Sequence, residues 1–212
     1  MQLREALNDI AEIRAQIERT ETYRGLRSVA VSVSSLLAFG AAVSCAYFPV
    51  EGKVNRFIGT WGVVAILSLL GVIFEMWVRA VHSENQIGKR FVWLAHRAML
   101  VQLLPSLVVG AVLTVVVSQH RELSWMLPGL WALAYCLGLF SCRQHLPDIA
   151  LLAAVYYLIR GAMSLLGATD IDRFDIELAN WQMVVNFGVG QLLLAFLIYW
   201  KLERRHGETE VP

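Results

Sequence analysis

Six long apolar runs, joined by short polar stretches, constrain this chain more than any other feature of its sequence. They cover residues 26–48, 58–78, 98–118, 124–141, 149–167 and 181–200. A helix needs about 20 mostly apolar residues to cross a hydrocarbon core about 30 Å thick. In that core an open chain can satisfy its backbone polar groups only as a helix. The sequence therefore predicts an all-α polytopic membrane protein, a bundle of six transmembrane helices.

The composition agrees with a membrane domain that carries no soluble module. Charged residues make up 17% of the chain and apolar ones 57%, against about 25% and about 45–50% in soluble domains. The polar segments are too short to build a core of their own. We divide the chain into an N-terminal segment 1–25, a transmembrane domain 26–200 and a basic, disordered tail 201–212. The net charge of +1 gives no reason to expect a nucleic-acid partner.

The basic residues are distributed unequally between the two sides of the six predicted spans. One side carries Arg4, Arg14, Arg19, Arg24, Arg27, Arg79, Lys89, Arg90, Arg97, Arg143, Lys201, Arg204 and Arg205. The other side carries Lys53, Arg56, Arg121 and Arg173. Because basic loops stay in the cytoplasm during insertion, this bias predicts that both termini are cytoplasmic.

The N-terminal segment has the pattern of an amphipathic helix. Apolar residues recur at spacings of three and four, which places them on one stripe: Leu3, Leu7, Ile10, Ile13 and Ile17. This stripe either lies on the protein's own cytoplasmic face and the lipid headgroups, or docks a protein partner. An exposed apolar stripe has to be covered by something.

Arg160 is the one basic residue well inside a predicted span, 11 residues into the fifth. Intramembrane charges need polar company and are functional hypotheses by default. Asn186 and Gln191 of the sixth span lie at depths that bracket Arg160, and Tyr156 is a fourth candidate. We therefore predict a polar cluster of these residues, either a structural site or a site for an anionic group. Arginine does not deprotonate, so a proton relay through Arg160 is disfavoured.

Neither catalytic nor metal-binding patterns stand out in the sequence. The five histidines do not converge on a ligand spacing, and the cysteines Cys45, Cys136 and Cys142 lie in or at the ends of spans without a CxxC motif. No HExxH or GxSxG motif occurs. These observations disfavour an enzyme, and we expect no cofactor and no metal site.

Tryptophans lie near both ends of the predicted spans. Trp61, Trp125 and Trp181 are close to the outer ends, and Trp77, Trp93 and Trp200 to the cytoplasmic ends. This arrangement is typical of interfacial anchoring belts. The outer connection 168–180 is acidic and has the spacing of a short interfacial helix, with Asp170 or Asp172 as its N-cap.

Several short motifs are similar to those of a group of bacterial integral membrane proteins without an assigned function. They run from Gly110-Ala-Val-Leu-Thr114 through Met126-Leu-Pro-Gly-Leu-Trp131, and include Ile13-Arg14 with Ile17-Glu18-Arg19, Lys201-Leu-Glu-Arg-Arg205, and an Arg-x-x-Pro element that is one residue longer here, Arg143-Gln-His-Leu-Pro147. The resemblance implies a small six-span inner-membrane protein, often encoded beside winged-helix transcription regulators. Arg160 is not part of that pattern, which favours a structural or lineage-specific role for it.

The sequence thus leads to three functional hypotheses. The first is a non-enzymatic interaction or regulatory component of the bacterial inner membrane, which works through a protein partner or self-association of its N-terminal helix. The second is a small transporter or permease-like protein that binds an anionic solute near Arg160. The third, an intramembrane enzyme without a recognisable motif, has the least support.

Overall fold

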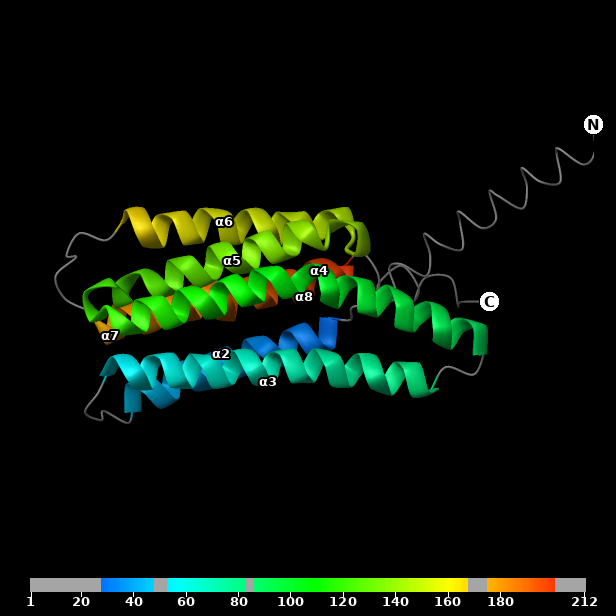
Figure 1. Cartoon of the computed structure of the whole chain (residues 1–212), viewed down its shortest axis with the longest axis horizontal. Helices are drawn as coiled ribbons and strands as arrows, with labels where there is room; N and C mark the ends of the chain where they lie inside the picture. Colours follow the sequence, from blue (N-terminus) through cyan, green and yellow to red (C-terminus); the bar gives the residue numbers. More distant parts are fainter. Residues whose placement is uncertain (1–27, 48–52, 83–85, 168–174, 201–212) are drawn as a thin grey trace, which may run out of the picture.

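The computed structural model describes residues 28–47, 53–82, 86–167 and 175–200, and the part of the chain that it describes is all-α (Figure 1). The helices are α2 (Ser28–Tyr47), α3 (Lys53–His82), α4 (Gln86–Gln119), α5 (Leu127–Ser141), α6 (Leu151–Leu166), α7 (Ile176–Met183) and α8 (Gly190–Ile198). Three 3₁₀ turns, η1 (Arg121–Met126), η2 (Arg143–His145) and η3 (Asp148–Ala150), flank α5 and α6. A π-helical turn, η4 (Val184–Val189), joins α7 to α8.

Six helical segments of the described chain are long and apolar enough to cross a membrane, which confirms the predicted all-α fold. They are Ser28–Tyr47, Val54–Glu75, Arg97–Gln119, Glu122–Ser141, Asp148–Leu166 and Ile176–Ile198. Each overlaps one predicted span. The chain is therefore an integral membrane protein. The predicted amphipathic helix and the predicted tail lie outside the described residues.

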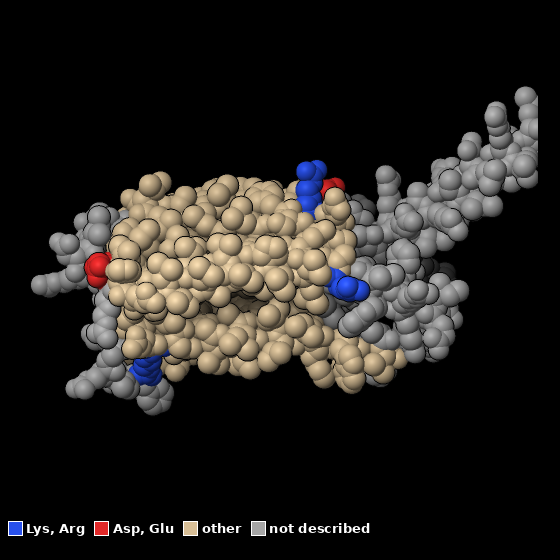
Figure 2. All heavy atoms as spheres, in the orientation of Figure 1, with Lys and Arg blue, Asp and Glu red and all other residues tan. Residues whose placement is uncertain are grey.

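The six segments run in alternating directions along the long axis of the bundle (Figure 1). We call the end at which α2 begins and α8 ends the entry end, on the right of Figure 1, and the opposite one the far end. Charged side chains on the face seen in Figure 2 lie at these two ends, and the band between them carries none. Such a band is what a hydrocarbon core requires of the surface that it contacts.

The last span begins five residues earlier than the sequence pattern indicated, at Ile176 instead of 181. Its N-cap is Asp175, whose carboxylate accepts hydrogen bonds from the backbone N–H groups of Glu177 at 2.9 Å and Leu178 at 3.5 Å. An aspartate at this position satisfies donors that the first turn of a helix leaves free. The helix therefore continues from the cap directly into the span. The predicted caps, Asp170 and Asp172, lie outside the described residues.

Two groups of buried apolar side chains hold the bundle together. The first lies mainly among α5, α6 and α8 and includes Cys136, Tyr157 and Leu194. The second lies toward the far end among α2, α3 and α7 and includes Phe57 and Met183. The last span contributes to both, since α7 belongs to the second group and α8 to the first.

Two glycines allow close contact between helices α5 and α6. A Cβ atom on Gly161 would lie 2.8 Å from Leu133 Cγ and 3.1 Å from the carbonyl oxygen of Gly129. A Cβ atom on Gly129 would lie 3.0 Å from the carbonyl oxygen of Gly161. Small residues allow such close backbone contacts in lipid, where packing rather than the hydrophobic effect drives helix association.

Candidate functional site: a buried polar cluster at a π-helical turn

The π-helical turn Val184–Val189 lies in the middle of the last span. A π-turn replaces the i→i+4 hydrogen bonds of an α-helix with i→i+5 bonds. Such turns are rare in proteins, and those that occur are frequently found at functional sites. It also leaves backbone carbonyls that neighbouring groups must satisfy, because no water reaches the hydrocarbon core. The residues around this turn are therefore candidates for a functional site.

Two side chains from other helices hydrogen-bond to carbonyls of this turn. The Tyr156 hydroxyl of α6 donates to the Val185 carbonyl at 2.6 Å. The buried Ser35 hydroxyl of α2 donates to the Gly188 carbonyl at 2.7 Å. These bonds attach the turn to helices on either side of it.

Asn186 is fully buried, with 0% of its surface exposed. Its amide Nδ2 donates to the carbonyl of Pro128 at 3.2 Å, at the first turn of α5. Its Oδ1 is buried and has no hydrogen-bond partner among the described residues. A buried acceptor without a donor is costly and calls for an explanation, such as a water or a ligand.

Gln191 lies one turn further along the last span and is also buried. Its side chain is within hydrogen-bonding reach of the Tyr135 hydroxyl of α5. Tyr135 packs edge-on against Tyr157 of α6, with ring centroids 4.7 Å apart. Phe187 contacts both rings, at centroid distances of 5.9 Å from Tyr135 and 5.7 Å from Tyr157. The Tyr157 hydroxyl is buried without a hydrogen-bond partner in the described structure.

Arg160 is half-buried on α6, one turn after Tyr156, and its charge interacts with the phenol of Tyr156. Its Nε atom is buried and has no hydrogen-bond partner among the described residues. The structure thus brings Tyr156 to Arg160. Asn186 and Gln191 instead face partners on α5, and within the described chain no hydrogen bond joins either of them to Arg160.

Ser35 and Tyr135 were missing from the predicted cluster. Ser35 belongs to a run of small residues in the first span, which the sequence marks as a packing face without showing that one hydroxyl reaches the last span. Tyr135 gives no signal of its own in an apolar run. The predicted docking stripe, Leu3, Leu7, Ile10, Ile13 and Ile17, lies outside the described residues.

Asn180 forms a second polar contact, near the far end, which the sequence did not indicate either. It accepts a hydrogen bond at 3.2 Å from the indole Nε1 of Trp61 and donates one at 2.9 Å to the carbonyl of Ala42. Trp61 is only 3% exposed and belongs to the helix interface, so its interpretation as an interfacial anchor is wrong. Trp181, 64% exposed, has the exposure expected of an anchor.

The described residues contain no group of three or more His, Cys, Asp or Glu side chains placed to hold a metal ion.

Three buried polar atoms around the π-turn lack partners in the described structure: Tyr157 Oη, Arg160 Nε and Asn186 Oδ1. We call the side chains around the turn, Tyr135, Tyr156, Tyr157, Arg160, Asn186 and Gln191, the π-turn cluster. Its chemistry is hydrogen bonding, with one fixed positive charge at its edge.

The six apolar helical segments of the described residues define the chain as an integral membrane protein. No protein-family model, no curated protein and no solved structure matches it. The resemblance stated from the short sequence motifs therefore stays a prediction.

Proposed function

We propose that this protein is a non-enzymatic membrane component that acts by binding a partner protein or a second copy of itself. The observation that carries the proposal is the position of α3 and α4. Along its apolar segment, each packs on the bundle through one stripe and exposes a broad apolar face.

Helix α3 contacts the rest of the bundle through a stripe that includes Phe57, Trp61, Val64 and Val72. Large apolar side chains cover the remaining surface: Val63, Ile66, Leu67, Leu70, Ile73, Phe74, Trp77 and Val81. Helix α4 has the same character, with exposed Val101, Leu104, Leu107, Val108, Val109, Val112, Val115 and Val116. Lipid can cover these surfaces, and so can the helices of another membrane protein.

Both helices also extend beyond their apolar segments at the entry end. Helix α3 continues from Glu75 to His82, and α4 begins at Gln86, well before its segment starts at Arg97. At 1.5 Å per residue these extensions are about 10 Å and about 16 Å long. A helical pair that continues out of the hydrocarbon offers a partner a surface in the membrane and another in the aqueous phase.

We further propose that the protein resides in a bacterial inner membrane with the entry end in the cytoplasm. The excess of Lys and Arg in the segments at that end supports this orientation. The predicted N-terminal helix would then share the cytoplasmic side with the extensions of α3 and α4. Reporter fusions at residue 212 and at the far-end connection 168–174 test the orientation, since only the first should report the cytoplasm.

The proposal is tested by photo-crosslinking in native membranes. A crosslinking amino acid at Phe74 or Leu104 should capture one discrete partner, either another protein or a second copy of the chain, which mass spectrometry identifies. Leu158, an exposed position on α6, serves as the matched control and should capture lipid alone. Truncation to residues 25–212 tests whether the N-terminal helix contributes to the same association. Lipid adducts alone at Phe74 and Leu104 would overturn the proposal.

A solute-binding role is the second candidate, and an unpartnered atom of the π-turn cluster favours it. Arg160 Nε, which is buried without a hydrogen-bond partner in the described structure, would gain one from a small anionic solute. Arg160→Leu separates the two candidates. Crosslinking from Phe74 should survive that substitution, whereas uptake of an anionic solute into proteoliposomes should be lost if the second candidate is right.

A further inference from the structure

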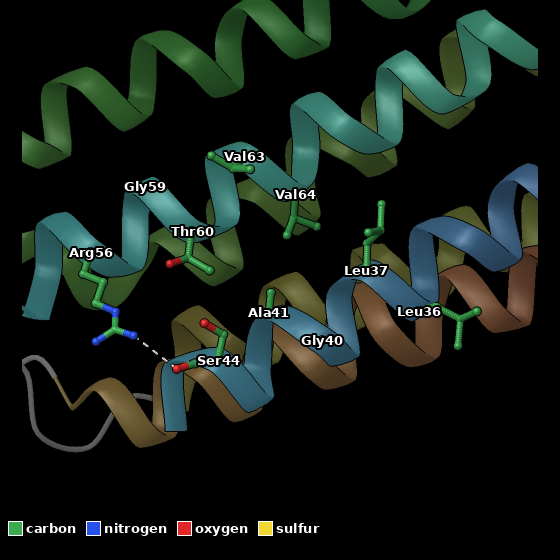
Figure 3. A pocket seen from close by; sticks show the side chains of 10 residues that line it. All are labelled: Leu36, Leu37, Gly40, Ala41, Ser44, Arg56, Gly59, Thr60, Val63 and Val64. Carbon is green, nitrogen blue, oxygen red and sulfur yellow. Dashed lines mark hydrogen bonds between the residues drawn. The ribbon is translucent and has the colours of Figure 1, made fainter. Parts of the chain in front are cut away.

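An open groove of about 650 Å³ runs between α2 and α3 in the far half of the bundle. Figure 3 shows the two helices side by side, with Leu37, Ala41, Thr60 and Val64 between them. The lining is mostly apolar and is made by Leu36, Leu37, Gly40, Ala41, Ser44, Arg56, Gly59, Thr60, Val63 and Val64. None of its lining residues belongs to the π-turn cluster, and it shares only Val63 with the exposed α3 surface used in the proposed function.

Two glycines keep the groove open. A Cβ atom built on Gly40 of α2 or on Gly59 of α3 would meet no other atom within 4 Å. Neither glycine is therefore needed for close contact between helices, in contrast to Gly129 and Gly161. The two glycines leave free space along the apolar lining of the groove. A flexible hydrocarbon chain fits into this space.

Arg56 lies at one end of the groove, and its side chain reaches from α3 toward the end of α2 (Figure 3). Its Nη2 donates to the carbonyl of Ser44 at 3.2 Å, and its Nη1 is buried without a hydrogen-bond partner in the described structure. No carboxylate among the described residues forms an ion pair with it. Arg56 is the third residue of the apolar segment Val54–Glu75, and from this position near its end a long side chain can reach the lipid headgroups.

We propose that this groove binds one anionic phospholipid, with its phosphate on the Arg56 guanidinium and one acyl chain along Gly59, Val63, Gly40 and Leu36. The charge of Arg56 and its unsatisfied N–H call for an anionic acceptor, and phosphate oxygens suit a guanidinium. The apolar lining beyond Arg56 calls for hydrocarbon. An anionic phospholipid brings both groups into the membrane, with the phosphate nearer to the surface and the acyl chain below it.

The test uses the full-length protein in detergent, exchanged with lipid mixtures and examined by native mass spectrometry. The probes are phosphatidylglycerol, which is anionic, and phosphatidylcholine, which is zwitterionic. The wild-type protein should retain one phosphatidylglycerol in preference to phosphatidylcholine. Arg56→Gln should lower that preference about fivefold, the effect expected for one basic residue near a lipid surface. Arg56→Lys keeps the charge and should retain most of it.

Two further variants test the acyl-chain part of the site. Gly40→Leu fills the groove and should reduce retention of both lipids, whereas Gly71→Leu, at an exposed glycine of α3 outside the groove, should not. Arg143→Gln, at an exposed arginine of the entry end, is the matched control for charge. Helix content by circular dichroism shows that each variant is folded.

Equal retention by the wild type, Arg56→Gln and Gly40→Leu would overturn the proposal. So would a change from dimer to monomer in Gly40→Leu with unchanged lipid retention, because the groove would then belong to a contact between two copies. Neither result bears on crosslinking from Phe74 and Leu104, so this inference and the proposed function can fail independently.

Discussion

The Ser35 hydroxyl donates a 2.7 Å hydrogen bond to the carbonyl of Gly188, 153 positions away in the chain. Both groups are buried, and the bond attaches the first described span to the π-turn of the last one. Gly188 allows the approach because it lacks a side chain, and a Cβ there would lie 3.1 Å from the ring of Phe39 in α2. Sequence-distant polar contacts of this kind determine how the six spans of this bundle fit together.

Ser35→Ala should destabilise the folded bundle by about 1–2 kcal/mol, because it leaves a buried carbonyl of the π-turn without its donor. The measurement is the unfolding midpoint in mixed detergent micelles. Ser34→Ala is the matched control, since Ser34 bonds only to Ala30 of its own helix, at 3.1 Å. Equal effects of the two substitutions would contradict the structural role given to Ser35.

Gly161→Ala should separate α5 from α6 and lower the free energy of unfolding by about 1–3 kcal/mol, the range for overpacking a tight interior. The added Cβ would meet Leu133 at 2.8 Å and the backbone oxygen of Gly129 at 3.1 Å, and backbone cannot move aside cheaply. Gly62→Ala meets no atom within 4 Å and should be neutral or slightly stabilising. Unfolding in a denaturing detergent compares the two variants.

Asn186→Ala and Arg160→Leu should have opposite consequences for stability. The first removes the donor to the Pro128 carbonyl in a fully buried place, and should cost about 1–3 kcal/mol. The second removes a half-buried charge from a membrane segment and should be neutral or stabilising. The thermal midpoint in one detergent tests both. A large loss in Arg160→Leu would show that Arg160 forms contacts that hold the bundle together.

Cys142 follows the fourth span directly and should be unreactive in the folded protein. It is buried, its Sγ donates to the carbonyl of Met99 at 3.5 Å, and burial raises the pKa of its thiol from 9.0 to about 11. At pH 8 about one thiol in a thousand is then ionised, and the thiolate is the reactive form. Maleimide labelling between pH 7 and 9, read by mass spectrometry, should be negligible at Cys142 until the protein is denatured.

The same pKa shift has a consequence for stability. The folded state holds the thiol proton more tightly than the unfolded state does, so the shift contributes stability that is present in full below the unfolded pKa of 9.0. That contribution is lost as the pH rises through about 11. Cys142→Ser, with a hydroxyl that does not ionise in this range, should flatten the decline in unfolding midpoint between pH 9 and 11.

The six spans could be predicted from the sequence because hydrocarbon allows few backbone conformations and sets their length. The start of the sixth could not, since Asp175 is one of several acidic residues that could cap it. Counting residues from the predicted span ends placed Arg160, Asn186 and Gln191 at similar depths, but the last span begins five residues earlier than that count assumed. The direction in which each side chain points depends on helix rotation, and depth alone did not indicate that Asn186 bonds to α5.

Trp61 is another residue whose side-chain direction did not follow from its position along a span. Its position near the end of a span is that of an anchor, and only the packing of α2, α3 and α7 reveals that Asn180 accepts its indole proton. The π-turn had no sequence signature that we recognised. It depends on donors supplied by Tyr156 and Ser35, which lie in two other helices.

The π-turn makes the last span a helix with two phases. Before it, Ala179 and Met183 face the apolar group formed with α2 and α3; after it, Leu194 and Ile198 face the group formed with α5 and α6. Each residue of an α-helix advances by about 100°, so deleting one residue within 184–189 would rotate all of α8 by about that angle. Gln191 and Leu194 would leave their partners while α7 kept its own. The number of residues in this turn thus sets the rotational alignment of one half of the bundle with the other.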